Sequence, residues 1–556
     1  MLREKPKTII DVLTLDYHLA ELPSSQHRAG LAGLVCIIRW LDRQPEFREK
    51  VAHGAICKLT RVDERGATLI LNHSGVKALF DEIYSASTEE QERPQRLKNK
   101  DKEIIPPIRE VEREFTDAKG KTKVKTAYIY PIVVPTGSFL ADPTYDRSIE
   151  DKNGLWIKLW RDMVWSILRG VPATRKPFEA RAEGSYSDDA TSVWQQLSKA
   201  EDYTVELPST YFLGAQANNA ENVPFKDRGR LQFLLHFWLF AAQIYVPAVI
   251  DNENKRNFVG YALTIPDVAN LEWFCDQLPE MLSDRSIEKS GYRPRDAIVD
   301  LAVASALDIM KRLRDRLQQA TGEKLPEHIV FGIDVIHTEK QGNNIRVLSS
   351  TRLDPEESML DQYAQIRDGF WNPLFRKQCL LNLVTHQPWH AGFDRLLCTL
   401  PYELSIKNSY FQRDVREKFN LLKDEDKSME ETIGTESSSA MEALVFRLVS
   451  NYVTRKLKSK YDLEWKSEWK GMKNDELNQR ADYKKYSEMK SKIAKSAFLD
   501  VRSRTEQMDF INYFVSSLCS VPQRMKSDSY VDLTQALYQE TDKVRTLTLL
   551  ALSANS

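Results

Sequence analysis

The sequence has few of the features that mark a catalytic or metal-binding protein. Its six cysteines are spread over 556 residues and none forms a CxxC pair, which excludes the common zinc patterns and suits a reducing compartment without disulfides. HExxH and Rossmann glycine motifs are absent, and "NHSGV" has Asn72 in place of the first glycine of GxSxG. We therefore expect no catalytic residues, no metal and no cofactor.

The chain also lacks an excess of charge and a clear membrane-spanning segment. It has 79 Lys and Arg against 80 Asp and Glu, so whole-chain charge neither favours nor excludes a nucleic-acid partner. The longest apolar stretch, residues 231–250, is interrupted by polar residues and a proline, which predicts a buried core helix rather than a membrane span. The first residues contain no sustained apolar run, and we expect a cytoplasmic protein without membrane contact.

The N-terminal part of the sequence predicts a mixed α/β region. Residues 1–86 combine a helical pattern with a hairpin around Asp63–Gly66 and indicate a small α/β module. Residues 87–127 hold 11 Lys or Arg and 9 Asp or Glu, typical of a solvated flexible insertion, with a basic arm as the alternative. Residues 128–422 form an aromatic-rich α+β body, in which we assign Trp156, Trp160 and Trp165 to core packing rather than to stacking platforms for bases.

The C-terminal part predicts helices only. An acidic, serine-rich linker is expected over residues 423–439. Beyond it, four helical patterns at about 440–460, 474–502, 505–520 and 528–553 predict a bundle over residues 440–556. The predicted fold class is therefore α+β, a mixed N-terminal α/β region followed by a C-terminal all-α helical bundle.

The opening helix carries an unusual polar first turn. In "LPSSQHRAGLAGLVCIIRWL", residues 22–41, the side chains of Gln26, His27 and Arg28 precede an apolar stripe. Unpaired backbone N–H groups and the positive helix end favour an anion there, and Gly30 and Gly33 allow another backbone to approach closely. A phosphate is the expected guest, and a capped core helix with incidental polar residues is the alternative.

The bundle carries a local surplus of positive charge. Between Arg447 and Arg504 there are 16 Lys or Arg against 8 Asp or Glu, and aromatics alternate with the bases in "KSKYDLEWKSEWKGMK" and "RADYKKYSEMKSKIAK". This pattern is typical of a face that binds a polyanion, although a solvated helix surface would have a similar composition.

Several blocks of the sequence together resemble a known family. They are "LPSSQHRAGLAGL", "FLGAQANNAENVPF", "LLHFW", "DFINYFVSSLCSVPQ" and the basic helical C-terminus. The chain resembles the large subunit of type I CRISPR Cascade effectors, in the Myxan-type branch allied to subtype I-B, some of whose relatives serve transposons. The resemblance covers most of the chain and is weakest in the charged insertion.

The resemblance implies a non-enzymatic protein. Such subunits contact the 5′ handle of the guide CRISPR RNA, recognise the protospacer-adjacent motif (PAM) in target double-stranded DNA, support R-loop formation and recruit an effector. The implied protein partners are the backbone, handle-binding and small subunits of Cascade, and a recruited nuclease-helicase or transposition adaptor. The helical C-terminal domain, which resembles a small subunit, is expected to bind the displaced DNA strand.

The resemblance also suggests roles for particular residues. Gln26, His27 and Arg28 would hold a phosphate or base of the guide handle, and Gly30 and Gly33 would pack on a partner subunit. "GAQANNAENVPFKDRGR" would read the PAM. The amides Gln216, Asn218 and Asn219 would contact the bases, and the cations Lys226, Arg228 and Arg230 would contact the DNA backbone. An ordinary asparagine-rich surface loop is the alternative. Phosphates of the displaced strand would bind the bundle cations Arg455, Lys456, Lys458, Lys460, Lys484, Lys485, Lys492 and Lys495.

Two other functions stay open at this point. One is a nuclease or nucleotide-dependent enzyme with an unrecognised site, which would cleave a substrate by itself. The other is a helical interaction protein whose basic bundle docks on acidic partners. Binding of single-stranded DNA distinguishes the second from the nucleic-acid hypothesis.

Overall fold

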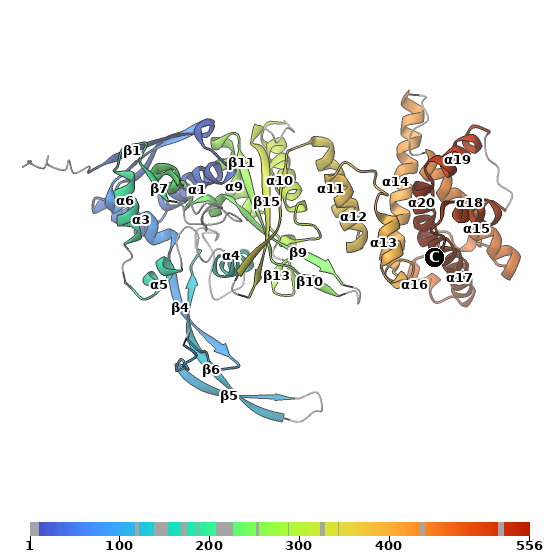
Figure 1. The fold of residues 1–556 in the computed structure, drawn as a ribbon, viewed down its shortest axis with the longest axis horizontal. Helices are drawn as coiled ribbons and strands as arrows, with labels where there is room; N and C mark the ends of the chain where they lie inside the picture. The colour runs from blue at the N-terminus through green and yellow to red at the C-terminus, as the bar shows by residue number, and fades with distance from the viewer. Residues whose placement is uncertain are drawn as a thin grey trace, which may run out of the picture. The chain divides into compact units, whose positions relative to one another are not determined.

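The computed structural model describes residues 11–99, 101–116, 122–137, 154–167, 175–185, 188–206, 226–251, 255–286, 288–322, 328–342, 344–433, 440–520 and 527–556. The chain folds into two compact units, coloured from blue to yellow and from yellow to red in Figure 1. Unit 1 comprises Met1–Pro247 and Val259–Pro355, and unit 2 comprises Ala248–Phe258 and Glu356–Ser556. The division after Pro355 falls inside the segment that we expected as one body. The α/β first unit and helical second unit confirm the predicted α+β class.

The first sheet of unit 1 contains the predicted hairpin. Its antiparallel strands run in the order β1–β3–β2, with bounds β1 (Leu13–His18), β2 (Cys57–Asp63) and β3 (Gly66–Leu71). In the turn, Asp63 Oδ1 accepts the N–H groups of Arg65 and Gly66 at 2.9 and 3.0 Å. Three helices accompany this sheet: α1 (Ser25–Leu41), α2 (Pro45–Ala52) and α3 (His73–Ile83).

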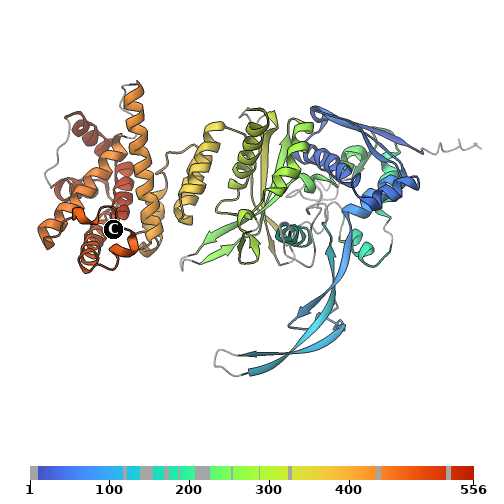
Figure 2. The same ribbon diagram turned by 180° about the vertical axis from the view of Figure 1, so that it is seen from behind.

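Three stretches of the charged segment 87–127 form β-strands, where a flexible insertion was expected. It belongs to a three-stranded antiparallel sheet of order β4–β6–β5, with bounds β4 (Ala86–Arg93), β5 (Arg109–Thr116) and β6 (Thr122–Pro135). We call residues 86–135 the arm, and it projects from the rest of unit 1 in both views (Figures 1 and 2).

Ion pairs cross the arm from β5 to β4 on one face of the sheet. The central strand β6 buries Ile129 on one face of the sheet. On that face, Arg109 on β5 pairs with Glu90 on β4 at 2.5 Å, and Arg113 pairs with Glu92 at 3.0 Å. The long side chains reach across β6 and cover its apolar residues with their methylene groups. The charged side chains therefore lie over the apolar residues of β6.

A second, larger sheet forms the centre of unit 1. Strands β9 (Gln243–Ile250), β11 (Tyr261–Val268), β15 (Val330–Gln341) and β16 (Asn344–Leu353) follow one another in antiparallel pairs, and β14 (Ile298–Val299) joins β9 in parallel. The pairing of β15 with β16 extends to Gln341 and Asn344. Helix α1 packs against β11 and α9 (Leu271–Ser283), and α10 (Ala304–Thr321) packs against β11 and β15.

Short elements complete unit 1. They are α4 (Gly154–Ser166), α5 (Lys176–Ala182), α6 (Asp189–Leu197), β7 (Thr204–Glu206), β8 (Lys226–Arg228), α7 (Gly229–Leu234), α8 (Trp238–Ala241), β12 (Lys289–Ser290) and β13 (Arg293–Pro294). Trp156 and Trp160 on α4 are buried, as the core-packing interpretation predicts.

The apolar stretch 231–250 is buried but is not one helix, which corrects the sequence prediction. It forms most of α7, then α8, then strand β9. Helix α1 packs tightly against this segment: a Cβ atom on Gly30 would lie 2.4 Å from the carbonyl oxygen of Leu234, and one on Gly33 would lie 2.0 Å from that of Phe237. The close backbone approach predicted at these glycines is thus made by the chain itself. Within the described ranges, no helix is long and apolar enough to span a membrane.

Unit 2 is a helical assembly, and its helices from residue 440 on lie within or close to the spans predicted from the sequence. Its helices are α11 (Glu357–Gly369), α12 (Pro373–Val384), α13 (Phe393–Thr399), α14 (Ser409–Ile433), α15 (Ala440–Tyr461), α16 (Asn474–Leu477), α17 (Ala481–Ser503), α18 (Gln507–Tyr513), α19 (Ser527–Gln539) and α20 (Thr541–Ala554). Unit 2 also includes β10 (Arg256–Phe258), which pairs with the end of β9. A single π-helical turn, Phe514–Leu518, extends α18.

Two boundaries in unit 2 differ from the prediction. Helix α14 continues to Ile433, so much of the expected linker 423–439 is helical, and residues 434–439 lie outside the described residues. The last predicted helix is two helices, α19 and α20, that meet at Glu540. Helix α20 is buried on all sides and contacts α13, α14, α15, α17, α18 and α19. It forms the centre of the bundle because its apolar residues are not confined to one stripe.

Candidate nucleic-acid interface

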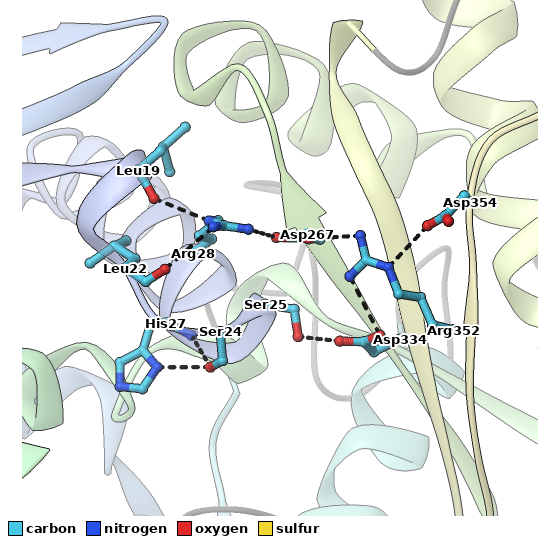
Figure 3. A network of polar contacts seen from close by, with 10 residues as sticks. All are labelled: Leu19, Leu22, Ser24, Ser25, His27, Arg28, Asp267, Asp334, Arg352 and Asp354. Carbon is cyan, nitrogen blue, oxygen red and sulfur yellow. Dashed lines mark hydrogen bonds and ion pairs between the residues drawn. The ribbon is translucent and has the colours of Figure 1, made fainter.

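The first turn of α1 is a closed hydrogen-bonded unit (Figure 3). Ser24 caps the helix, since its side chain accepts the backbone N–H of His27. The same Ser24 Oγ lies 2.8 Å from His27 Nδ1, and His27 Nε2 lies 3.0 Å from Asp227 Oδ2. The imidazole is only 1% exposed. His27 is therefore held between a serine of its own turn and a carboxylate two hundred residues away.

Arg28 is held in the same way on the other side of the turn. Its guanidinium donates to Asp267 Oδ1 at 2.5 Å and to the carbonyl oxygens of Leu19 and Leu22 at 3.1 and 3.4 Å. The other oxygen of Asp267 pairs with Arg352 at 2.9 Å. Asp267, on β11, thus links helix α1 to strand β16 (Figure 3).

A third carboxylate completes the group. Ser25 donates to Asp334 on β15, and Arg352 lies between Asp334 at 3.7 Å and Asp354 at 2.9 Å. A hydrogen bond and charge from Asp267, together with Asp354 and Asp334, raise the pKa of Arg352 above its usual value although burial acts to lower it. The start of α1 therefore meets the carboxylates of Asp227, Asp267 and Asp334.

These contacts answer why a buried helix begins with strong polar side chains. Carboxylates of the chain itself contact the side chains of this turn: Asp334 meets Ser25, Asp227 meets His27 and Asp267 meets Arg28. Gln26 is buried beside His27. Contact of Gln26, His27 and Arg28 with guide RNA stays a prediction, and it would require these internal pairs to open.

The predicted PAM-reading loop lies partly outside the described residues. Gln216, Asn218 and Asn219 fall in the range 207–225, which the structure does not describe. The cations that follow them are placed on strand β8 and helix α7. Lys226 and Arg228 are exposed, whereas Asp227 between them is directed to His27. Strand alternation thus separates the two exposed cations from the half-buried carboxylate of Asp227.

Arg228 and Arg230 border a small surface hollow of mixed charge. Arg230 is paired with Glu201 at 3.4 Å, and its carbonyl oxygen accepts the hydroxyl of Tyr17 at 2.8 Å. The side chain of Arg228 has no ion-pair partner within the described residues. The hollow is lined by Asp16, Tyr17, His18, Glu21, Leu22, Glu201, Arg228, Arg230 and Leu231.

Unit 2 holds a compact aromatic cluster where helices α15 and α17 are connected. Trp469 is buried, with its ring centre 5.4 Å from that of Trp465 and 5.3 Å from those of Tyr483 and Tyr486. The contacts are edge-to-face, which is the favourable arrangement for such pairs. Trp465 is the outer member of the cluster and remains 50% exposed. Its ring is therefore fixed from behind and open to solvent in front.

Ion pairs fasten the connecting segment to the start of α17. Asp482 accepts from Lys466 at 2.8 Å and from Arg480 at 3.1 Å. Hydrogen bonds from Arg480 and then Lys466 lower the pKa of Asp482 far below its usual value. Glu468 also pairs with Arg480, at 2.8 Å. These pairs thus hold the connecting segment that carries Trp465 against the start of α17.

Most of the cations predicted to bind the displaced strand are exposed on helices α15 and α17. Five of the eight are exposed and have no ion-pair partner in the described part of the chain: Arg455, Lys460, Lys484, Lys485 and Lys492. We call these five side chains and Trp465 the basic face. The other three predicted cations contact groups of the protein.

Those three cations are engaged within unit 2. Lys458 forms an ion pair with Glu464, and the ammonium of Lys456 lies 5.7 Å from the ring centre of Tyr452. Lys495 lies 4.7 Å from the ring centre of Tyr402 and donates to its hydroxyl at 3.4 Å. Lys495 is the most firmly held of the eight.

Neither Trp465 nor the three rings behind it were among the site residues predicted from the sequence. The signal was present in the aromatics that alternate with bases in both quoted segments. Which of these rings is exposed depends on how the segment 462–480 folds back on α17. Elsewhere, the described residues contain no group of three side chains able to hold a metal ion.

Comparison with protein families identifies the chain. The model of the type I-B CRISPR Cas8b N-terminal domain matches residues 56–323, and that of the Cas8b C-terminal domain matches residues 330–555. The chain belongs to the type I-B CRISPR Cas8b family. No curated protein matches it.

The match confirms the type I-B large subunit that the sequence blocks suggested, and with it membership of a CRISPR Cascade complex. The Myxan-type branch and the association with transposons stay predictions. The two Cas8b models meet between residues 323 and 330, whereas strands β15 and β16 fold with unit 1. The hairpin of the C-terminal family model is therefore part of the N-terminal structural unit.

Proposed function

We propose that this Cas8b chain is the non-catalytic large subunit of an RNA-guided DNA surveillance complex, and that its basic face holds the displaced DNA strand. The observation that carries the proposal is the exposed ring of Trp465 in the connection between α15 and α17, two helices that carry five exposed cations with no ion-pair partner in the described residues. Proteins that bind single strands combine a positively charged surface with aromatic side chains on which bases stack. Both components are present here on adjoining helix ends.

The family membership supports the other parts of the function. Recognition of the PAM in duplex DNA is assigned to the loop of Gln216, Asn218 and Asn219, and backbone contact to Lys226 and Arg228. Contact with the guide-RNA handle, support of the R-loop, and recruitment of a nuclease-helicase or a transposition adaptor complete the proposal. Each is what the family implies for a chain of this kind.

Substitution of Trp465 tests the role of the basic face. In Trp465→Ala, the loss of one stacked base is expected to weaken binding of a labelled single-stranded oligonucleotide by the full chain about 5- to 150-fold, from about 1–3 kcal/mol per base. Fluorescence anisotropy measures the affinity. The dependence of affinity on salt should be unchanged, because no cation is removed.

Trp371→Ala is the matched control for this experiment. Trp371 is also in unit 2 and is 56% exposed, but its ring is stacked on Arg413 and is not part of the aromatic cluster. Its substitution should leave the affinity for the oligonucleotide unchanged. Equal losses in both variants would refute the assignment of the strand to the basic face. Metal-dependent cleavage of the oligonucleotide by the purified chain would refute the non-catalytic function.

A further inference from the structure

Two cysteines of unit 1 lie against each other on neighbouring helices. Cys36 is on α1 and Cys275 is on α9, and the thiol of Cys275 donates to the carbonyl oxygen of Ala32 at 3.6 Å. Within helix α1 that same carbonyl is the acceptor for the backbone N–H group four residues later, which belongs to Cys36. The sulfur of Cys275 is therefore placed beside the backbone of Cys36, although the two residues are far apart in the sequence.

Further contacts hold the two helices together at this point. The side chains of Cys36 and Cys275 share a hydrogen bond. The next residue of α9, Asp276, forms an ion pair with Arg39 of α1 at 2.7 Å. Ala32, Cys36 and Arg39 are spaced four and three residues apart, so they share one face of α1, along which α9 packs. The two sulfur atoms are thus kept in contact by groups on either side of them.

The two thiols differ in their access to solvent. Cys275 is only 2% exposed, whereas Cys36 is half-buried. Burial raises the pKa of the Cys275 thiol well above its usual value, and the hydrogen bond with Cys36 acts in the same direction. Cys275 therefore stays protonated at neutral pH, and Cys36 is the sulfur of this pair that a small reagent in solution can reach.

We propose that Cys36 and Cys275 form a reversible redox site, at which a peroxide produces a disulfide between α1 and α9. The thiolate of Cys36 attacks the peroxide: an S–O bond forms, the O–O bond breaks, and the released hydroxide takes up the proton that Cys36 has lost. The sulfur of Cys275 then attacks this sulfenic acid: the S–S bond forms, the S–O bond breaks, and the departing hydroxide takes the proton of Cys275. Two thiols are oxidised by two electrons, and one hydrogen peroxide is reduced to two waters.

The disulfide closes a loop that contains most of unit 1. The residues between 36 and 275 include β2, β3, the whole arm, β9 and β11. A crosslink across so long a loop restricts the unfolded chain far more than the folded chain. Oxidation should therefore raise the midpoint of thermal unfolding by about 5 °C or more, and a reducing agent should reverse the change. The proposal does not depend on nucleic-acid binding at the basic face.

Peptide mapping of the oxidised chain tests the proposal. The full chain is treated with hydrogen peroxide, its remaining thiols are blocked with iodoacetamide, and the digest is compared by mass spectrometry with and without dithiothreitol. The expected product joins the peptides of Cys36 and Cys275, is lighter than the two free peptides by two hydrogen atoms, and disappears on reduction. Unmodified thiols, a sulfinic acid at Cys36 without the crosslink, or a disulfide between two copies of the chain would overturn the proposal.

Thermal unfolding of matched variants gives a second test. Cys36→Ser should lose both the crosslinked peptide and the rise in the unfolding midpoint on oxidation. Cys519→Ser is the control, because Cys519 is also half-buried but lies in unit 2, directly after the π-helical turn. This control should keep the crosslink and the rise. An equal rise in Cys36→Ser, or no rise in the crosslinked wild-type chain, would show that a disulfide between α1 and α9 does not constrain unit 1.

Discussion

Removal of two cations from the basic face should change how DNA binding responds to salt. Lys484 and Lys485 lie in the first turns of α17, are exposed and have no ion-pair partner within the described residues. Their substitution by alanine breaks no internal contact, and alanine is a good helix former, so we expect the fold to be unaffected. The double variant therefore isolates the contribution of two charges to strand binding.

The size of the effect follows from counterion release. Each phosphate neutralised on a single strand adds about 0.7 to the slope of log affinity against log salt concentration, so two lysines contribute about 1.4. Between 50 and 200 mM salt, wild-type affinity should thus fall about sevenfold more than that of the variant. The reduction should be the same for every oligonucleotide sequence, because phosphates carry no sequence information.

Fluorescence anisotropy of a labelled single-stranded oligonucleotide over a salt series measures both slopes. The control combines Lys50→Ala with Lys340→Ala, two exposed lysines of unit 1 that also reduce the net charge by two. The control slope should equal that of wild type. A slope that falls equally in both variants would show that only net charge matters, and an unchanged slope in Lys484→Ala/Lys485→Ala would show that no phosphate binds there.

Two further predictions concern the stability of unit 1. Gly33→Ala should lower the free energy of unfolding by about 1–3 kcal/mol in chemical denaturation, because the new Cβ would lie 2.0 Å from the carbonyl oxygen of Phe237. In the control, Gly369→Ala, the new Cβ would meet nothing within 4 Å, and the free energy of unfolding should not fall. Equal effects of the two substitutions would contradict the tight packing of α1. Burial lowers the pKa of His236 to about 3, so the unfolded chain binds more protons below pH 6.5. The free energy of unfolding should therefore be highest above that pH and lower by about 1.4 kcal/mol at pH 5.5. A His236→Gln variant that keeps the same pH dependence would refute this cause.

Local sequence determined the elements whose signals lie within a few residues. The hairpin around Asp63–Gly66 and the helical periodicity over most of α15 and α17 were predicted from the sequence. Each depends on side chains that contact their own backbone or repeat on one helix face, so no distant residue is needed to specify them. The basic surplus of the bundle was likewise visible in the sequence.

The tertiary structure decided which polar groups are used internally and which remain free. His27 and Arg28 meet Asp227 and Asp267, whose distance along the chain hides the pairing. The arm has strands because arginines and glutamates pair across β6, and a mixed-charge sequence is equally consistent with a solvated loop. The exposure of Trp465 depends on the rings packed behind it. Local patterns thus specify elements, whereas contacts between distant segments determine which side chains are left to bind a partner.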